Sequence, residues 1–269
     1  MIGINNLKAA LKQDKVLIGT FIRCCDPAVV ETIAYAGFDF IIIDNEHTAM
    51  DASAMVNLIR AAELCGIGAV VRINAISADR IQTVLDAGAL GVQVPQVDTP
   101  EQAAGIVRWS KYAPLGERGF AASQRACGYG RMDALEYARL ANEQTMVIGY
   151  CETAACVGNL DAILQTEGLD VIFMGPFDLS QSFGVLGQTD HPKVISVMEE
   201  VIGKTRAAGK SAGTIAANPQ QAKRWIEKGA RFIALSSDLG LMSAMGAAML
   251  SQLRGDEAIN ASISNKRGG

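Results

Sequence analysis

The sequence predicts a single α/β domain folded as a TIM (β/α)8 barrel, followed by one extra helix near its C-terminal end. Short apolar runs typical of strands buried on both faces recur along the chain, and segments with helical periodicity separate them. The runs number eight, which is the count that closes such a barrel. An open, doubly wound sheet is the alternative. We disfavour it because no Gly-x-Gly-x-x-Gly sequence follows the first run.

The expected strands and helices alternate in a regular order. Helix starts are marked by capping residues such as Ser77 and by pairs such as Asp26-Pro27 and Thr99-Pro100. The expected strands are 16–21, 38–44, 69–73, 90–94, 146–151, 171–174, 211–215 and 232–235. Helices are expected at 26–36, 51–65, 77–87, 99–110, 132–142 and 239–253, and residues 111–130 form the longest irregular stretch.

No linker divides the chain, so residues 1–253 are expected to form one barrel domain. Residues 1–16 read as an amphipathic helix and lack the apolar core of a signal peptide. The apolar helix at 239–253 follows the last strand, after the barrel is complete, and we expect it to pack at a subunit interface. The polar tail at 254–269 is expected to be loose.

The composition narrows the class of partner. The chain has 269 residues, a formal net charge of −4 and no basic cluster, which disfavours nucleic acid and anionic membranes as partners. No apolar run approaches the roughly 20 residues of a membrane span. The 6 cysteines form no Cys-x-x-Cys pair, and a reduced, cytoplasmic setting is the natural interpretation.

Ionisable residues gather where the expected strands end. Because all strands of a barrel point the same way, side chains that follow them meet on one face. The residues concerned are Asp44, Glu46 and His47 after the second strand, Arg72 at the third, Glu152 after the fifth and Asp178 after the sixth.

Glu152 and Asp178 follow neighbouring strands and could hold a hard divalent cation through oxygen ligands, leaving positions for water and substrate. Asp178 could equally cap the helix that begins near Leu179. Because the chain has only 2 histidines, an all-histidine zinc site is excluded.

His47 could be an ordinary loop residue or a catalytic base whose imidazole is oriented by Asp44 three residues earlier. Arg72 ends an apolar run and needs a carboxylate or an anionic ligand. No lysine lies at the carboxyl end of an expected strand, which disfavours Schiff-base chemistry. Cys24 and Cys25 lack a nearby activating group and are interpreted as packing residues.

Motifs along almost the whole chain, from about residue 19 to 240, resemble those of the HpcH/HpaI family of metal-dependent class II pyruvate aldolases. That family includes the 4-hydroxy-2-oxoheptanedioate and 2-dehydro-3-deoxyglucarate aldolases. Each motif alone is weak, whereas the series in this order is specific. The matching segments are Asp44-Asn45-Glu46-His47, Val71-Arg72-Ile73, Leu85-Asp86-Ala87-Gly88, the 112–119 segment, Glu152-Thr153, the 159–163 segment, Gly175-Pro176-Phe177-Asp178-Leu179 and Ser237-Asp238-Leu239-Gly240.

The resemblance implies a role for each matching residue. Glu152 and Asp178 would bind the divalent metal (Mg²⁺ or Mn²⁺, with Co²⁺ and Zn²⁺ as alternatives), and Arg72 would stabilise the enolate oxygen. His47 with Asp44 would act on the aldol hydroxyl. It further implies that Asp86 reaches the site of a neighbouring subunit, that Ser123 lines the pocket, and that the chain assembles as a homohexamer built from two trimers.

Two departures from the family pattern lie close to the expected metal. Tyr150 stands where many members have Gln, and Phe177 stands where many have Ser; both are expected to contact substrate. The expected function is cleavage or synthesis of 4-hydroxy-2-oxo acids from pyruvate, or a related 2-oxo acid, and an aldehyde, through a metal-stabilised enolate. Because of the two aromatic residues, the alternative is oxaloacetate-type decarboxylation or cleavage of an unusual substituted hydroxy acid.

Overall fold

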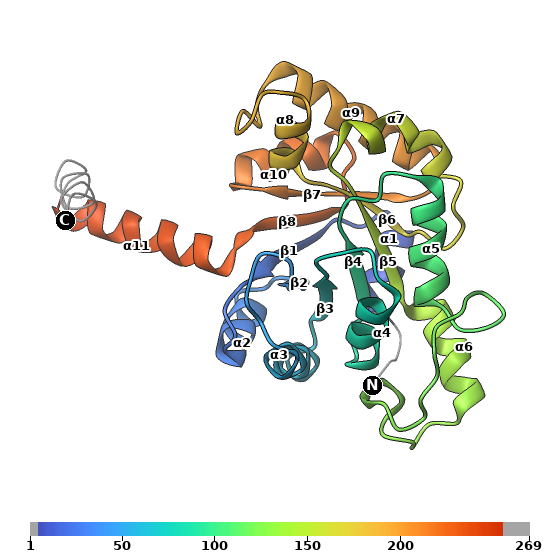
Figure 1. Cartoon of the computed structure of the whole chain (residues 1–269). Coiled ribbons are helices and arrows are strands. Elements are labelled where there is room, and N and C mark those ends of the chain that lie inside the picture. The colour runs from blue at the N-terminus through green and yellow to red at the C-terminus, as the bar shows by residue number, and fades with distance from the viewer. Residues whose placement is uncertain (1–4, 255–269) are drawn as a thin grey trace.

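The computed structural model describes residues 5–254, and within them eight parallel strands close into a barrel in the order of the sequence (Figure 1). Every neighbouring pair, including the pair that joins the first strand to the last, is parallel. The predicted TIM barrel is therefore confirmed. The strands are β1 Leu17–Ile22, β2 Phe40–Asp44, β3 Gly68–Arg72, β4 Gly91–Val94, β5 Met146–Cys151, β6 Val171–Met174, β7 Ser211–Ala216 and β8 Phe232–Ser237.

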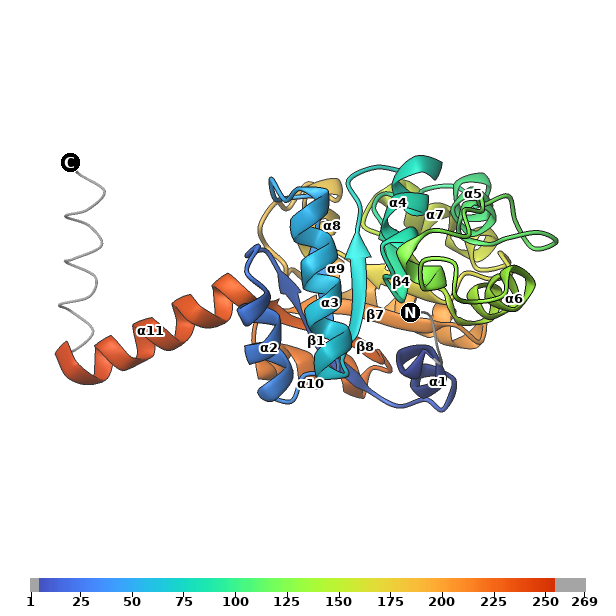
Figure 2. The same cartoon turned by 90° about the horizontal axis from the view of Figure 1, so that it is seen from below.

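Most helices surround the barrel on its outside, whereas α11 extends away from it (Figures 1 and 2). Most begin at an N-cap side chain that accepts a backbone hydrogen bond, as Asp51 and Thr153 do. The helices are α1 Asn6–Lys12, α2 Pro27–Tyr35, α3 Ala52–Cys65, α4 Ala78–Asp86, α5 Pro100–Ser110, the short 3-10 turn η1 Arg125–Cys127, α6 Ala134–Gln144, α7 Ala154–Ile163, α8 Pro176–Ser182, α9 Pro192–Ala207, α10 Pro219–Glu227 and α11 Asp238–Arg254.

The core has two layers because successive strand residues point to opposite faces. One layer fills the inside of the barrel, where the rings of Phe40 and Phe232 stack with their centroids 3.9 Å apart. The other layer, which includes Ile41 and Ile43, packs between the strands and the helices. This division explains why the run before Asp44 is apolar without alternation.

The register of the strands sets the positions of the polar residues. Asp44 at the end of β2 lies opposite Arg72 at the end of β3. Tyr150 in β5 lies opposite Phe173 in β6, and Cys151 opposite Met174, so Glu152 and Gly175 follow at the same level. The carboxyl ends of these strands therefore bring their side chains to one rim of the barrel.

Two local expectations are wrong. Asp178 is not the N-cap of its helix: α8 begins at Pro176 with Gly175 as the N-cap, which places Asp178 in the first turn. Cys25 is exposed and Cys24 only half-buried, so neither is a core packing residue.

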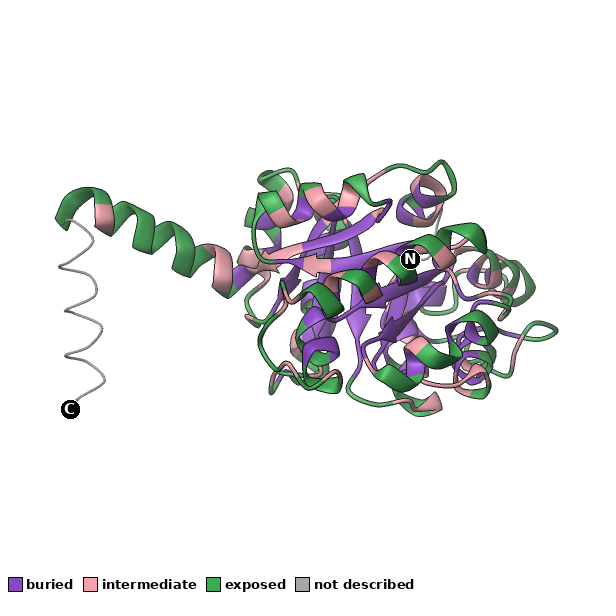
Figure 3. Cartoon of the chain, turned by 90° about the horizontal axis from the view of Figure 1, so that it is seen from above, coloured by how far each residue is buried: buried purple, intermediate pink, exposed green. Residues whose placement is uncertain are grey.

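Helix α11 projects away from the barrel and is mostly exposed along its length (Figures 2 and 3). Its apolar side chains remain open to solvent, with Met242, Met245 and Met249 all about 60% exposed. The tail predicted at 254–269 lies, apart from Arg254, outside the described residues. Among the helices described here, none combines the length and apolar character needed to cross a membrane.

Candidate active site

A cavity of about 260 Å³ opens at the carboxyl-terminal rim of the barrel. Five of the predicted site residues, namely His47, Arg72, Tyr150, Phe177 and Asp178, meet there, although they come from distant parts of the sequence. The cavity is lined by Phe21, Arg23, His47, Arg72, Tyr150, Gly175, Pro176, Phe177, Asp178 and Ile215.

Arg72 is the centre of the polar network. Its guanidinium is only 8% exposed and contacts two carboxylates, with Nη2 2.7 Å from Oδ2 of Asp44 and Nη1 3.0 Å from Oε2 of Glu46. Nη1 also donates to the hydroxyl of Tyr150 at 3.3 Å, and the ring of Phe21 lies 4.7 Å from Cζ. Burial alone would lower the pKa of Arg72, but Tyr150 and the two carboxylates outweigh it and raise the pKa, so the side chain stays charged.

Asp44 is fully buried and serves Arg72 and the loop rather than His47. One carboxylate oxygen accepts hydrogen bonds from Nε of Arg72 and from the backbone N–H groups of Glu46 and His47. The other oxygen faces Arg72 and also accepts from Nε of Arg23 at 3.2 Å. Burial would raise the pKa of Asp44, but the hydrogen bonds from Arg72 hold it below its usual value.

The imidazole of His47 has a different neighbour from the one the sequence predicts. Its Nε2 lies 3.7 Å from Oε2 of Glu46, while Asp44 contacts only the backbone of His47. The predicted orientation of His47 by Asp44 is therefore wrong at the side-chain level. Burial raises the pKa of Glu46, whose carboxyl lies between Arg72 and His47.

Glu152 and Asp178 converge beside Gly175. A methyl group added to Gly175 would lie 2.9 Å from Oε2 of Glu152 and 3.3 Å from Oδ2 of Asp178, so both carboxylates face the same side of this glycine. The other oxygen of Glu152 accepts from the backbone N–H of Gln96 at 2.9 Å. Burial and the charge of Asp178 raise the pKa of Glu152 to about 8.

This arrangement fits a hard divalent cation. Glu152 is buried and Asp178 is exposed, and a cation between their oxygens would neutralise the negative charge that Asp178 places beside Glu152. Within residues 5–254 no cluster of three or more His, Cys, Asp or Glu side chains is suited to a metal. A cation at Glu152 and Asp178 would therefore keep most of its positions for water and substrate, as Mg²⁺ commonly does.

Two predicted residues lie away from the cavity of their own chain. Ser123 is exposed in the loop before η1 and is not among the residues that line the cavity. The carboxylate of Asp86 pairs with Nη2 of the buried Arg118 at 2.5 Å, at the end of α4. The predicted contact of Asp86 with the site of a neighbouring subunit and the predicted pocket-lining role of Ser123 stay predictions.

The sequence reasoning missed Arg23 and gave Glu46 no role. Arg23 directly follows the buried β1 strand, and the same signal that pointed to Arg72 could have identified it. Its backbone N–H and that of Cys24 donate to Oδ2 of the buried Asp238, which fixes the loop after β1. Gln96 was also missed. Its backbone lies in the left-handed region at φ 52°, and its N–H donates a hydrogen bond to the carboxylate of Glu152.

A parallel eight-stranded barrel with a charged cavity at the carboxyl ends of its strands defines an α/β-barrel enzyme. Comparison with known proteins identifies the family of barrel enzymes to which the chain belongs. The family model for HpcH/HpaI aldolase/citrate lyase matches residues 17–244, and the chain belongs to this family.

Curated relatives of the chain are aldolases. A 2-dehydro-3,6-dideoxy-6-sulfogluconate aldolase of Pseudomonas putida is 32% identical over 92% of this chain and 96% of its own length. A 5-keto-4-deoxy-D-glucarate aldolase of Salmonella paratyphi C is 35% identical over 89% of this chain and 93% of its own length.

Solved structures of the family superpose closely. An HpcH/HpaI aldolase/citrate lyase family protein of Burkholderia cenocepacia has a TM-score of 0.89 at 32% identity, covering 93% of this chain and 99% of its own. The citrate synthase SbnG has a TM-score of 0.84 at 34% identity, covering 93% of this chain and 98% of its own.

Proposed function

We propose that this protein is a class II aldolase that cleaves or makes 4-hydroxy-2-oxo acids, with pyruvate or a related 2-oxo acid and an aldehyde as the partners of the reaction. The observation that carries this proposal is the buried, permanently charged Arg72, which lines the same cavity as Asp178 and lies close to Tyr150. The family membership and the aldolase relatives support it.

Arg72 stabilises the charge that the reaction creates. When the C3–C4 bond of a 4-hydroxy-2-oxo acid breaks, its electron pair moves toward the 2-keto oxygen, which becomes negative. A guanidinium already fixed by Asp44 and Glu46 needs no reorganisation to receive that charge, so it stabilises the transition state more than the ground state. The phenol of Tyr150 lies beside Arg72 and provides a second polar contact for the oxo acid.

His47 moves the proton. Its exposed imidazole lines the cavity, where it can take the proton of the 4-hydroxyl group during cleavage and return it in the aldol direction. Glu46 faces Nε2 and would stabilise the protonated imidazole. Asp44 acts through the positions of Arg72 and of the loop that carries His47.

Glu152 and Asp178 are the residues that would hold the cation, with Mg²⁺ or Mn²⁺ favoured by their oxygen ligands. The bound ion supplies Lewis-acid charge that polarises the oxygens of a 2-oxo acid. Two more distant relatives in the fold were solved as complexes with magnesium, one also with oxaloacetate and one with pyruvate. At 18% identity these show only that the barrel is the same, and they are consistent with the proposed ion.

A second function uses the same cavity on another substrate. The relative named a citrate synthase is 34% identical to this chain, so reactions beyond cleavage to an aldehyde are compatible with this framework. Together with the rings of Tyr150 and Phe177 in the cavity, this keeps oxaloacetate-type decarboxylation, or cleavage of an unusual substituted hydroxy acid, as the alternative.

The assembly we propose is a homohexamer of two trimers in the cytoplasm. The apolar side chains of α11 are exposed to solvent in the single chain, and packing against a neighbouring subunit would bury them. Asp86 and Ser123, which lie outside the cavity of their own chain, would then contribute to the site of a neighbour. The 6 cysteines are free thiols, consistent with a reducing compartment.

Removal of the metal tests the proposed function. Purified protein would be assayed for aldol addition of pyruvate to a panel of aldehydes before and after treatment with EDTA, and again after addition of Mg²⁺ or Mn²⁺. We expect EDTA to abolish turnover and either ion to restore it. Full activity in EDTA would contradict the metal dependence. Failure to form an aldol product with any donor would favour the alternative reaction, and decarboxylation of oxaloacetate would be measured in parallel.

A further inference from the structure

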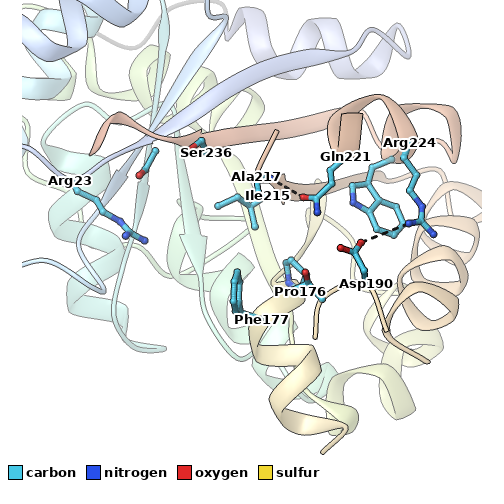
Figure 4. Close-up of a pocket in the computed structure, with 12 residues that line it drawn as sticks. Arg23, Pro176, Phe177, Asp190, Ile215, Ala217, Gln221, Arg224 and Ser236 are labelled. Atoms are coloured by element: carbon cyan, nitrogen blue, oxygen red, sulfur yellow. Dashed lines mark hydrogen bonds and ion pairs between the residues drawn. The ribbon is translucent and has the colours of Figure 1, made fainter. Parts of the chain in front are cut away.

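Strand β4 contributes no residue to the lining of the candidate active site. The site continues into a second cavity of about 250 Å³, with which it shares Arg23, Pro176, Phe177 and Ile215 (Figure 4). Neither cavity is lined by a residue of β4 (Gly91–Val94). A side chain on the inner face of β4 can therefore influence the reaction only through residues that do line the cavities.

The side chain of Gln93 in β4 points into the barrel. Val92 and Val94 on either side of it pack in the layer between the strands and the helices. Because successive side chains of a strand alternate between its two faces, Gln93 faces the inside. Its register partners are Arg72 at the end of β3 and Ile148 in β5. Gln93 therefore shares a level with Arg72, the centre of the polar network.

The amide of Gln93 is buried and unpaired. The residue is 0% exposed, and neither Oε1 nor Nε2 has a hydrogen-bond partner among residues 5–254. An amide in an apolar interior without partners is less stable than an apolar side chain of the same shape. Buried polar groups of this kind are usually paired, so this glutamine calls for a partner within reach of its side chain.

The phenol of Tyr150 complements this amide. Tyr150 stands two residues beyond Ile148 on the inner face of β5, diagonal to Gln93, and long or aromatic side chains can meet across such a diagonal. Its oxygen accepts a hydrogen bond from Nη1 of Arg72 at 3.3 Å. Because β4 lies between β3 and β5, that bond crosses β4 at the level of Gln93. The phenol also has a proton to donate, and no group in the described part of the chain accepts it.

We propose that Gln93 is a positioning residue of the active site, and that its Oε1 accepts the phenol proton of Tyr150 when substrate is bound. Rotation of the Gln93 side chain makes this contact. With a donor on one side of the phenol oxygen and an acceptor for its proton on the other, Tyr150 holds the guanidinium of Arg72 where the enolate charge develops. The inference rests on the proposed aldolase function and adds to it a residue that lines neither cavity.

Gln93→Met tests this role, because methionine keeps the shape of the side chain and removes its hydrogen bonds. Turnover would be measured for pyruvate with the panel of aldehydes and for oxaloacetate, each with Mg²⁺. We expect kcat to fall by about 10- to 100-fold, the range for losing a supporting hydrogen bond beside a reactive group. KM should change by less than about threefold, since Gln93 does not touch the substrate. Gln165→Met, at an exposed position beyond α7, is the matched control and should change neither constant.

Three further measurements separate positioning from a merely structural role. In a Tyr150→Phe background, which has no phenol proton, Gln93→Met should have little further effect on kcat. Without ligands, the urea midpoint of Gln93→Met should equal or exceed that of the wild type, because the variant buries no unpaired amide. The Raman Fermi doublet of tyrosine distinguishes a phenol that donates from one that only accepts, and subtraction of the Tyr150→Phe spectrum isolates Tyr150 among the 5 tyrosines. With Mg²⁺ and pyruvate, Tyr150 should donate in the wild type and only accept in Gln93→Met.

The outcomes bear separately on the two proposals. An unchanged kcat in Gln93→Met, an equal loss of kcat in both Tyr150 backgrounds, or a Tyr150 that only accepts in the wild type overturns this inference and leaves the aldolase function standing. A wild type without turnover on any substrate overturns the proposed function, and the Raman difference then still decides whether Gln93 pairs with Tyr150. If Gln93→Met does not fold, the spectra of the wild type and of Tyr150→Phe decide the question, because a Tyr150 without an acceptor does not donate.

Discussion

At the scale of single residues, the site depends on Arg72, which is held by Asp44 and Glu46 on one side and faces the cavity on the other. Arg72→Ala should lower kcat by about 10²–10³, in line with the loss of an oxyanion donor. Arg72→Lys should recover only part of the lost kcat, because an ammonium group cannot bind Asp44 and Glu46 and also contact the substrate as a guanidinium does. Steady-state rates on a 4-hydroxy-2-oxo acid check the prediction, and an Arg72→Ala protein with full turnover would refute the role.

Asp44 should matter for stability as well as for activity. It is fully buried between Arg72 and Arg23, and Asp44→Asn would keep its shape while removing the charge that both guanidinium groups need. We expect a loss of about 3 kcal/mol in the free energy of unfolding, the low end for breaking a buried pair, because Arg72 keeps Glu46. Urea denaturation measures it. Asp51→Asn, at an exposed N-cap where Asn serves equally well, is the control and should change stability little.

Which residues meet was easier to predict from the sequence than which atoms meet. The placement of Asp44, His47 and Arg72 on one rim follows from strand ends in a parallel barrel, and it is confirmed. The partner of the imidazole was not predictable, because an Asp three residues before a His can reach either its ring or its backbone N–H. Here the carboxylate of Asp44 accepts the backbone N–H of His47, and the carboxylate of Glu46 lies beside the imidazole ring.

At the scale of elements, apolar runs located all eight strands, and most of the uncertainty lay at their ends. The second strand begins at Phe40 rather than at residue 38, and just before it the Asp39 carboxylate accepts the backbone N–H of Ile18. The start of α8 was marked in the sequence by Pro176, a residue favoured at the first helical position, and this signal outweighs the capping preference of Asp178.

Helix α11 should control assembly. Its methionines are exposed in the single chain, so replacing Met245 and Met249 with Glu would place charges in the predicted interface. We expect the double variant to sediment as a smaller species than the wild type in analytical ultracentrifugation. Leu64→Glu, at an 86% exposed apolar residue on α3, is the matched control and should leave the assembly unchanged. An unaltered sedimentation coefficient in the α11 variant would contradict the predicted interface.

At the scale of the whole molecule, closure of the barrel was predictable from the strand count, but the relation between chains was not. Asp86 is predicted to reach the site of a neighbouring subunit, but a single sequence does not specify how two chains are oriented. The positive φ of Ser236 was not predictable either, because glycine is the residue expected at such a position.

The raised pKa of Glu152 should also couple the stability of the whole barrel to pH. In the metal-free protein the pKa of Glu152 is raised from 4.5 to about 8 by burial and by Asp178, so the folded chain binds a proton that the unfolded chain releases. Stability from this proton is full below pH 4.5 and is lost as the pH rises toward 8. Between pH 6 and pH 8 the metal-free wild type should therefore lose roughly 2 kcal/mol relative to Glu152→Gln, which has no proton to lose.

Divalent metal should reverse this trend, because the ion replaces the proton as the partner of the two carboxylates. Saturating Mg²⁺ should raise the melting temperature of the wild type more at pH 8 than at pH 6, and should leave Glu152→Gln nearly unchanged at both. Differential scanning calorimetry at the two pH values, with EDTA or with Mg²⁺, gives all the required comparisons. Equal stabilisation of the wild type and the variant by Mg²⁺ would place the ion elsewhere and remove Glu152 from the metal site.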